Sequence, residues 1–227
     1  IGASGQIKEF REETYYGEIG DPAHRHISHL LGLAPCSVIS RKTPAWLAAA
    51  AVSLRKRGNV AGGWGLANRM YAWARIGDAA EFARTFDKLL SECVFENLWS
   101  NHDAGNEFQI DANVGACAAI GEALLQSHEE GVRLLPCLHG AWQSGSFSGV
   151  CARGGFEIGA SWKDSALTEA CVLSKASEPF VLYTPDDVTV TDQDGNRISL
   201  SKTDDTISFA TKKGELYRIT GFTANNL

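Results

Sequence analysis

Two kinds of segment are missing from this chain of 227 residues, namely long apolar runs and dense runs of positive charge. No apolar run approaches the roughly 18 to 20 residues that a membrane-spanning helix needs, and the chain does not open with the pattern of a signal peptide. The net charge is −6, and the basic residues are scattered apart from the short run RKR at 55–57. We therefore expect no membrane span and no nucleic-acid partner, and a neutral substrate fits this charge balance better.

The chain also lacks an initiator methionine, since it opens with Ile1 and the sequence IGASGQIKEF. This opening is typical of the interior of a helix-rich protein, so we expect the chain to continue a longer one. CxxC pairs are absent as well, which favours an interpretation of the cysteines as small buried apolar residues. Their even number nevertheless permits disulfides in a secreted protein. They are Cys36, Cys93, Cys117, Cys137, Cys151 and Cys171.

Apolar sequence is plentiful, because 44% of the residues are hydrophobic and six are tryptophan. This content is enough for one large core or two small ones. In the first half, Thr43 and Pro44 are suited to cap and start a helix over 45–54, which Gly58 ends. Further helices are expected over about 64–76, after an Asp78 cap with Glu81 three residues on, and over 113–127.

From about Val132 the pattern changes to short strands with a period of two. Strands are expected over 133–135, 146–152, 156–162, 167–174 and 180–183. Two hairpins are expected to follow, one joining 188–191 to 198–200 through the turn DQDGN, and one joining 207–210 to 216–219. The chain is thus predicted to be mainly α and then β, with an α domain over 1–130 and an antiparallel β-sandwich domain over 131–227.

Three polar clusters interrupt the helical half, and the first is DPAHRHISHL at 21–30. Its histidines and arginine are directional hydrogen-bond donors that could bind hydroxyls or a carboxylate. Two alternatives stay open for this cluster. One is a loop whose histidines only bridge helices, and the other is a metal site formed by His24, His26 and His29 with Asp111 or His102.

The second cluster, GNVAGGWGLANRM at 58–70, delivers Trp64 to the start of a helix through a glycine-rich turn. An indole face can stack on the C–H face of a sugar, although a tryptophan of the core is the alternative. The third cluster, NLWSNHDAGNEFQIDAN at 97–113, contains His102, Asp111 and Asn113. Asp111 precedes a helix, whose dipole favours the ionised carboxylate. It could help to activate a water molecule, or it could be a simple N-cap.

The order of these clusters resembles one known family. GQIKEF, DPAHRHISHLLGLAP, TPAWLAAAAVSLRKRG, GGWGLANRMYAWARIGD, NLW, FQIDANVG, LLQSH, LLPCLHGAW and GGFEI follow one another as they do in the inverting α-L-fucosidases, glycoside hydrolase family 95. The resemblance covers about residues 5–165, and the pair HRHISHL and FQIDAN is the most specific part of it. The last 60 residues are similar only in their β character.

The resemblance implies a parent enzyme with an N-terminal β domain, a catalytic (α/α)6 barrel and a C-terminal β domain, of which this chain supplies the last part. It implies release of terminal α-L-fucose from a fucosylated oligosaccharide or glycan with inversion, without a metal or an organic cofactor. Asp111 corresponds to the aspartate that polarises the water-binding asparagines of the family. Arg25 and His26 match residues that look like sugar-binding contacts of the family, with His102 and Trp64 as further pocket members. Asn113, close to Asp111 in the third cluster, is also expected to bind substrate.

The general acid and the water-positioning asparagines of the family belong to motifs that are absent from this chain, so the N-terminal half of the enzyme is an expected partner. The loop DAGNE before FQID also differs from the proline-containing version of the family. Enzymes of this type are often exported. The alternatives are an α-L-galactosidase, a non-catalytic carbohydrate-binding or scaffold relative, and a histidine-rich metal hydrolase.

Overall fold

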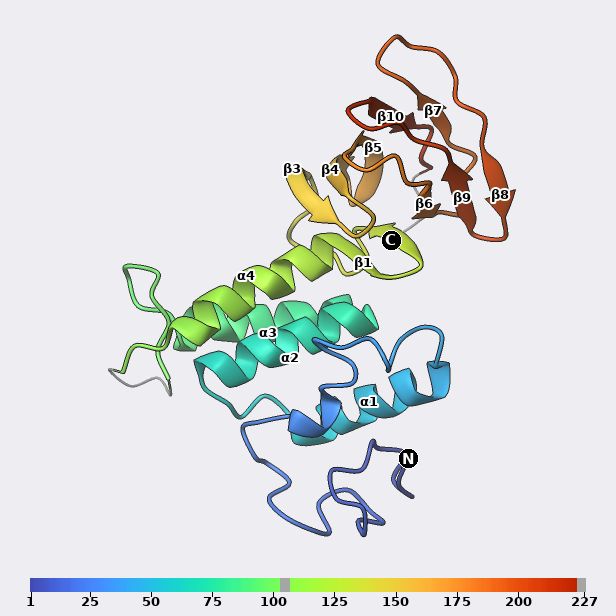
Figure 1. Cartoon of the computed structure of the whole chain (residues 1–227). Coiled ribbons are helices and arrows are strands. Elements are labelled where there is room, and N and C mark those ends of the chain that lie inside the picture. Colours follow the sequence, from blue (N-terminus) through green and yellow to red (C-terminus); the bar gives the residue numbers. More distant parts are fainter. Residues whose placement is uncertain (103–106, 224–227) are drawn as a thin grey trace. The chain divides into compact units, whose positions relative to one another are not determined.

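The computed structural model describes residues 1–102 and 107–223, and the chain divides into two compact units, Ile1–Ala123 and Leu124–Leu227. The helices lie in the first unit and the strands in the second, as the change of periodicity predicts (Figure 1). The division falls before the expected boundary at 130/131, because Leu125–Glu129 form strand β1 and do not extend the last helix. The helical elements of the described residues are η1 (Ser28–Leu30), α1 (Pro44–Arg57), α2 (Gly63–Ile76), α3 (Ala79–Glu92) and α4 (Ile110–Leu124).

Helix α1 begins at Pro44 as predicted, but the side chain of Thr43 does not cap it. The Thr43 hydroxyl accepts a hydrogen bond from the Ser40 N–H at 3.0 Å and lies 3.2 Å from the carbonyl oxygens of Val38 and Ser40. This hydroxyl therefore closes the turn that precedes the helix. The proline supplies the fixed φ of a first helical residue and has no N–H to satisfy.

The end of α2 and the start of α3 follow the predicted signals. Gly77 ends α2 in the left-handed conformation with φ 85°, which a glycine adopts without steric cost. The Asp78 carboxylate then accepts a hydrogen bond from the Glu81 N–H at 3.1 Å. On α3, Phe82 and Leu89 are buried while the opposite face is polar, and this amphipathic pattern confirms the expected helix.

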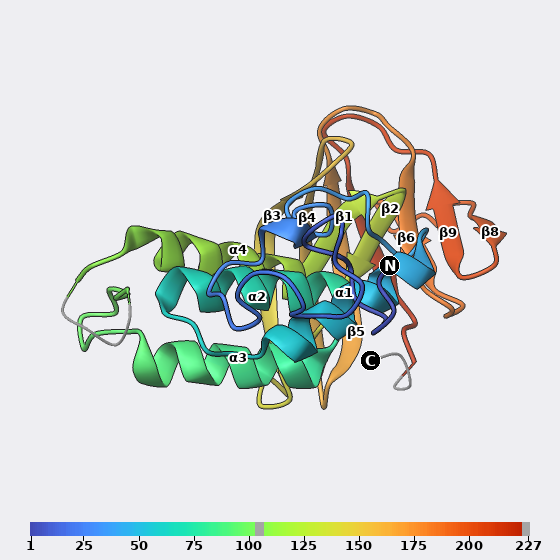
Figure 2. The ribbon, with the colours of Figure 1, turned by 90° about the horizontal axis from the view of Figure 1, so that it is seen from below.

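Helices α2 and α4 run side by side in the same direction, and both begin beside the loop over 93–109 (Figures 1 and 2). Near their starts, a Cβ atom placed on Gly63 would lie 2.9 Å from Cβ of Ala112. Near their ends, Arg75 Nε donates to the Glu122 carboxylate at 2.6 Å. The positive ends of both helix dipoles therefore lie at the same end of the first unit.

In the second unit, the described strands form two sheets of five strands, in the orders β1-β2-β6-β9-β8 and β3-β4-β5-β10-β7. Neighbouring strands are antiparallel except β2 and β6, which are parallel. The strands after β1 are β2 (Gly131–Leu134), β3 (Gly145–Ala152), β4 (Phe156–Lys163), β5 (Ala166–Ser174), β6 (Phe180–Tyr183), β7 (Thr189–Thr191), β8 (Ser201–Thr203), β9 (Thr206–Phe209) and β10 (Leu216–Thr220).

Both sheets contribute side chains to one apolar core. Phe180 of β6 packs edge-on against Phe156 of β4 with ring centroids 5.0 Å apart, and its centroid lies 5.5 Å from that of Phe209. The alternation of buried residues along β6 and β9 is the period of two that the sequence shows.

The first predicted hairpin forms: Thr191 bridges Arg197 in antiparallel fashion, and the Ile198 N–H donates to the Val190 carbonyl oxygen at 2.9 Å across the turn DQDGN. The second predicted hairpin is wrong, because β9 and β10 belong to different sheets. Strand β7 pairs with β10, and β9 pairs with β6 and β8. A further hairpin, not predicted, joins β8 to β9 through a turn in which Asp204 has φ 48°. Turn residues mark where the chain reverses, but the partner of a strand depends on which of its faces is buried against the core.

None of the six cysteines forms a disulfide in the described structure. Cys93 and Cys137 are buried as expected, whereas Cys36, Cys117 and Cys151 are exposed. A cysteine is buried when it lies on the side of its segment that packs against the core. The spacing of cysteines in the sequence does not specify this side. Among the described residues, no helix has the length and apolar character that crossing a membrane demands.

Candidate functional site

A small, open pocket lies at the end of the first unit where α2 begins. It is formed by the turn over 21–27, by the start of α2 and by the loop over 93–109. Four of the expected substrate-binding residues therefore meet in one place, although they are far apart in the sequence. The pocket is lined by Arg25, His26, Gly62, Trp64, Gly65, His102 and Gln109.

The start of α2 is held by the loop rather than by a capping side chain. The Gly63 N–H donates to the His102 carbonyl oxygen at 2.9 Å, and the Trp64 N–H donates to Gln109 Oε1 at 2.9 Å. These bonds satisfy two of the free N–H groups that every helix start presents. A side chain at Gly63 has no room, because a Cβ atom would lie 2.3 Å from the Asn101 carbonyl oxygen. The glycine-rich turn thus brings Trp64 and His102 to the same pocket.

Gln109 is a pocket residue that sequence reasoning missed. Its side chain reaches the start of α2, and its carbonyl oxygen accepts a hydrogen bond from the Ser100 hydroxyl. The available signal was its position in FQIDAN, directly before a helix. A glutamine at such a position can satisfy the first N–H groups of a neighbouring helix.

The two histidines of the 21–27 turn are close neighbours. The His26 N–H donates to Nδ1 of His24 at 3.2 Å. Their ring centroids lie 5.3 Å apart. Burial lowers the pKa of His26, and the positive charges of Arg25, His24, Arg69 and His102 lower it further. His26 is therefore a neutral imidazole at neutral pH, able to donate one hydrogen bond and to accept another.

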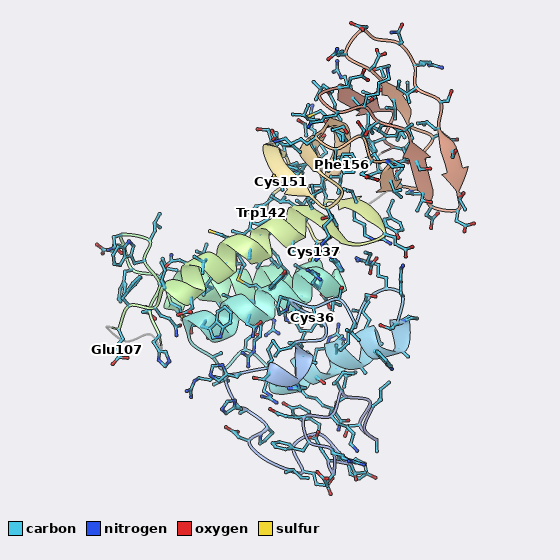
Figure 3. All side chains as sticks on the ribbon, in the orientation of Figure 1. Cys36, Glu107, Cys137, Trp142, Cys151 and Phe156 are labelled. Atoms are coloured by element: carbon cyan, nitrogen blue, oxygen red, sulfur yellow. The ribbon has the colours of Figure 1, made fainter. Side chains whose placement is uncertain are left out.

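The described residues of the loop over 93–109 form a short ribbon with bridges between Val94 and Ser100 and between Asn101 and Phe108. Because side chains alternate along such a ribbon, the pocket residues His102 and Gln109 face away from Phe108. Residues 103–106, most of the segment DAGNE, lie outside the described residues. Figure 3 shows Glu107 at the outer edge of this loop and Cys36 toward the other end of α2.

The other face of this ribbon is apolar and uncovered in the described structure. The rings of Trp99 and Phe108 are 4.4 Å apart, and they are 54% and 47% exposed. Ile110 and Val114 on the first turns of α4 are 54% and 60% exposed. Exposed apolar groups gathered in one place are typical of a surface that another element covers.

Asp111 lies in the first turn of α4 and is exposed. It does not line the pocket, but α4 begins at the same end of the unit as α2. Its carboxylate lies near the positive end of the α4 helix dipole. Asn113 does not line the pocket either. Its Oδ1 accepts a hydrogen bond from the Ser100 N–H at 2.9 Å, and its Nδ2 donates to the Leu98 carbonyl oxygen at 2.8 Å.

The proposed histidine metal site has no counterpart in the part of the chain that is described, where no group of three metal-ligating side chains occurs. His29 lies outside the pocket, with a side chain that is 4% exposed and Nδ1 at 3.9 Å from a Glu9 carboxylate oxygen. The lining groups that remain are imidazoles, a guanidinium, an amide and an indole. Such a pocket suits a polar, uncharged ligand with several hydroxyl groups.

Comparison with known proteins defines the class of the chain. Residues 1–124 match the Glycosyl hydrolase family 95 catalytic domain, and residues 126–219 match the Glycoside hydrolase family 95, C-terminal domain. The chain therefore belongs to glycoside hydrolase family 95.

Two curated relatives are similar over most of the chain. "Alpha-L-fucosidase 2" of Arabidopsis thaliana is 36% identical over 74% of the chain, and "Probable alpha-fucosidase A" of Aspergillus niger is 28% identical over 75% of it. The chain spans only 21% and 24% of the lengths of these two proteins. A solved family 39 glycoside hydrolase from Bacteroides cellulosilyticus WH2 is 11% identical, and the match covers 63% of this chain and 30% of that one with a TM-score of 0.28, too low to establish a shared fold.

Proposed function

We propose that this chain is the C-terminal part of an inverting α-L-fucosidase that releases terminal α-L-fucose from oligosaccharides. The observation that carries the proposal is the meeting of Arg25, His26, Trp64 and His102 in one pocket. Asp111 stands at the start of the helix that begins beside this pocket. The printed names of the two relatives, both α-fucosidases, support the choice of sugar.

In this proposal the pocket residues bind the sugar ring. Arg25 and His102 donate hydrogen bonds to ring hydroxyls, and neutral His26 can serve a hydroxyl as donor or acceptor. Trp64 offers an aromatic face for the C–H side of the ring. Asn113 acts through the loop that it holds, since both ends of its amide are bonded to the 98–100 segment.

Asp111 is proposed to polarise an amide that binds the nucleophilic water. An inverting glycosidase places its acid and its base assembly roughly 6.5 to 9.5 Å apart, so that water fits between the base and the sugar. A neutral amide is a weak base, but a carboxylate hydrogen-bonded to it stabilises the positive charge that develops as water loses a proton. The Asp111 carboxylate has no hydrogen-bond partner among the described residues and is free to take this role. The scheme also requires the water-binding amides and the general acid. It requires no metal or organic cofactor.

The amides and the acid are proposed to come from the part of the enzyme that precedes this chain. Helices α1 to α4 would then complete an (α/α)6 barrel, in which the exposed face of Trp99, Phe108, Ile110 and Val114 is covered. The two sheets of the second unit, which share one apolar core, would be a β-sandwich.

The test uses the full-length enzyme that contains this chain, with Asp111→Asn as the variant and Asp204→Asn as its matched control. Asp204 is exposed in the β8–β9 turn with φ 48°, a conformation that asparagine tolerates. Fucose release from a 2′-fucosylated oligosaccharide measures turnover, and NMR of the first product identifies the anomer. An α-L-galactoside assayed in parallel tests the choice of sugar.

We expect Asp111→Asn to lower kcat on the order of 10² to 10⁴-fold with the fold intact, because the amide loses the charge that polarises it. Asp204→Asn should match the wild type. We also expect the isolated chain to be inactive. Near-normal turnover of Asp111→Asn, retention of configuration, or activity in the isolated chain would each contradict the proposal.

A further inference from the structure

Two buried arginines bind the backbone of the turn that carries Arg25 and His26. Arg57 at the end of α1 is 3% exposed, and Arg69 in the middle of α2 is fully buried. Arg57 Nη1 donates to the carbonyl oxygens of His24 at 3.1 Å and His26 at 2.6 Å. Arg69 donates through Nη1 to the carbonyl oxygen of Arg25 at 2.7 Å and through Nη2 to that of His24 at 3.4 Å. Three successive carbonyl groups thus point toward guanidinium groups in the interior.

Each guanidinium is itself fixed by further bonds. Arg57 Nε donates to the Tyr16 hydroxyl at 2.8 Å, and Arg57 Nη2 pairs with the Glu9 carboxylate. Arg69 Nε donates to the Gly58 carbonyl oxygen at 2.8 Å, and its Nη1 to that of Gly65 at 2.9 Å. Every nitrogen of both guanidinium groups is therefore bonded. A lysine has three donors on one atom and cannot reproduce this planar arrangement.

We propose that Arg57 and Arg69 are positioning residues, which hold the backbone of the 24–26 turn so that the side chains of Arg25 and His26 project into the pocket. The inference rests on the proposed function, because it assumes that this pocket binds the sugar. The two arginines bind the carbonyl groups of the turn from the interior. The side chains of Arg25 and His26 then lie on the opposite side, where both line the pocket.

The close approach of the turn to α2 is a second requirement of this arrangement. A Cβ atom on Gly65 would lie 2.7 Å from Ala61 Cβ, 3.0 Å from the Arg25 carbonyl oxygen and 3.3 Å from Arg69 Nη1. Glycine at position 65 leaves room for the carbonyl group to reach the guanidinium. A larger residue there would push the 24–26 turn away from α2.

The charge of Arg69 has an additional effect on the pocket. Among the described residues it is bonded to carbonyl oxygens and to no carboxylate, and burial lowers its pKa to about 10. The charged and titratable groups that face His26 are Arg25, His24, Arg69 and His102, and after burial each of them lowers the pKa of His26. Arg69 thus helps to keep His26 neutral, which gives the positioning role a readout in the pH profile.

The experiment compares Arg57→Lys, Arg69→Lys and Arg75→Lys in the full-length enzyme. Arg75 is the matched control, because it is also 3% exposed and also lies on α2. It binds Glu122 and the Cys36 carbonyl oxygen, away from the 24–26 turn. The values of kcat and KM are measured with a 2′-fucosylated oligosaccharide and corrected for the folded fraction by circular dichroism.

We expect kcat/KM to fall on the order of 10- to 100-fold in Arg57→Lys and Arg69→Lys, since a displacement of about 1 Å can cost about 10²-fold. Part of the loss should appear in KM, because Arg25 and His26 contact the bound sugar before reaction. Arg75→Lys should stay within about twofold once corrected for folding, as expected for a change that leaves the site geometry intact.

The pH dependence of kcat/KM separates the effect of the Arg69 charge from its effect on the geometry of the 24–26 turn. Arg69→Gln should move the acidic limb of kcat/KM to higher pH, because His26 then accepts a proton more readily, whereas Arg69→Lys should leave the limb in place. If a lysine variant does not fold, Gly65→Ala provides the same test of geometry and should also lower kcat/KM.

Equal losses in all three lysine variants of an active enzyme, or wild-type kinetics of Gly65→Ala, would overturn the positioning role alone. A wild-type enzyme without fucosidase activity would overturn the proposed function and this inference with it.

Discussion

Asn113→Ala tests whether Asn113 binds substrate or holds the loop that does. Its amide makes two hydrogen bonds that no other group replaces, from the Ser100 N–H and to the Leu98 carbonyl oxygen. The Ser100 hydroxyl also lies 2.8 Å from Asn113 Oδ1, but its single hydrogen can go to the Gln109 carbonyl oxygen instead. Two hydrogen bonds, one half-buried and one exposed, at about 0.5 to 1.5 kcal/mol each make the loop about 1 to 3 kcal/mol easier to open.

Hydrogen exchange followed by mass spectrometry measures this opening directly. Since 1.4 kcal/mol corresponds to a factor of ten, amide exchange in a peptide over 94–109 of the full-length enzyme should accelerate about 5- to 150-fold. The Gly63 N–H, which is bonded to the His102 carbonyl oxygen, should exchange faster as well. The value of KM should rise as a consequence, because the loop supplies His102 and Gln109 to the pocket.

Asn68→Ala is the control, since Asn68 is a half-buried residue of α2 whose side chain has no hydrogen bond in the described structure. It should leave the exchange of the 94–109 peptide unchanged. A rise in KM for Asn113→Ala with wild-type exchange in the loop would refute the argument, because it would mean that the Asn113 amide contacts the sugar itself.

Two further predictions concern stability. Burial lowers the pKa of His29, with Arg57 acting in the same direction and Glu9 and Glu13 against it, so the unfolded chain binds a proton at a higher pH than the folded one. The free energy of unfolding should therefore decrease as pH falls from about 6.5 toward the lower folded-state pKa. His29→Leu should flatten this slope in thermal unfolding between pH 7 and 5, and equal slopes would contradict the assignment. Phe180→Ala should cost about 3 to 5 kcal/mol by emptying the centre of the β core, measured by urea unfolding, and a loss below about 1 kcal/mol would show that the core repacks.

Much of the secondary structure could be predicted because its signals are local. The proline at the start of α1, the glycine that ends α2 and the Asp78 cap of α3 each act within one turn of the chain. The pairing of strands was not predictable in this way. Strands β9 and β10 are neighbours in the sequence but belong to different sheets, and their choice of partner follows from the shared core rather than from the turn between them.

The residues of the candidate site also divide into those that the sequence predicts and those that only the structure shows. Arg25, His26, Trp64 and His102 could be selected from their residue types and motifs, and they do line one pocket. Gln109 was missed although its position directly before a helix was a signal. Arg57 and Arg69 could not be selected, because a basic run at a helix end and an arginine within a helix are typical of a solvated surface. Only the structure shows both arginines buried against the 24–26 turn.

What the sequence determined by itself was the order of an α part and a β part, the positions of most helices and strands, and the family-specific clusters HRHISHL and FQIDAN. These depend on periodicity, caps and residue types that act over a few residues. The tertiary structure decided which strands pair, which arginines are buried, and which polar residues share a pocket. Such contacts join segments tens of residues apart, and their free energy depends on packing and desolvation that no local pattern contains.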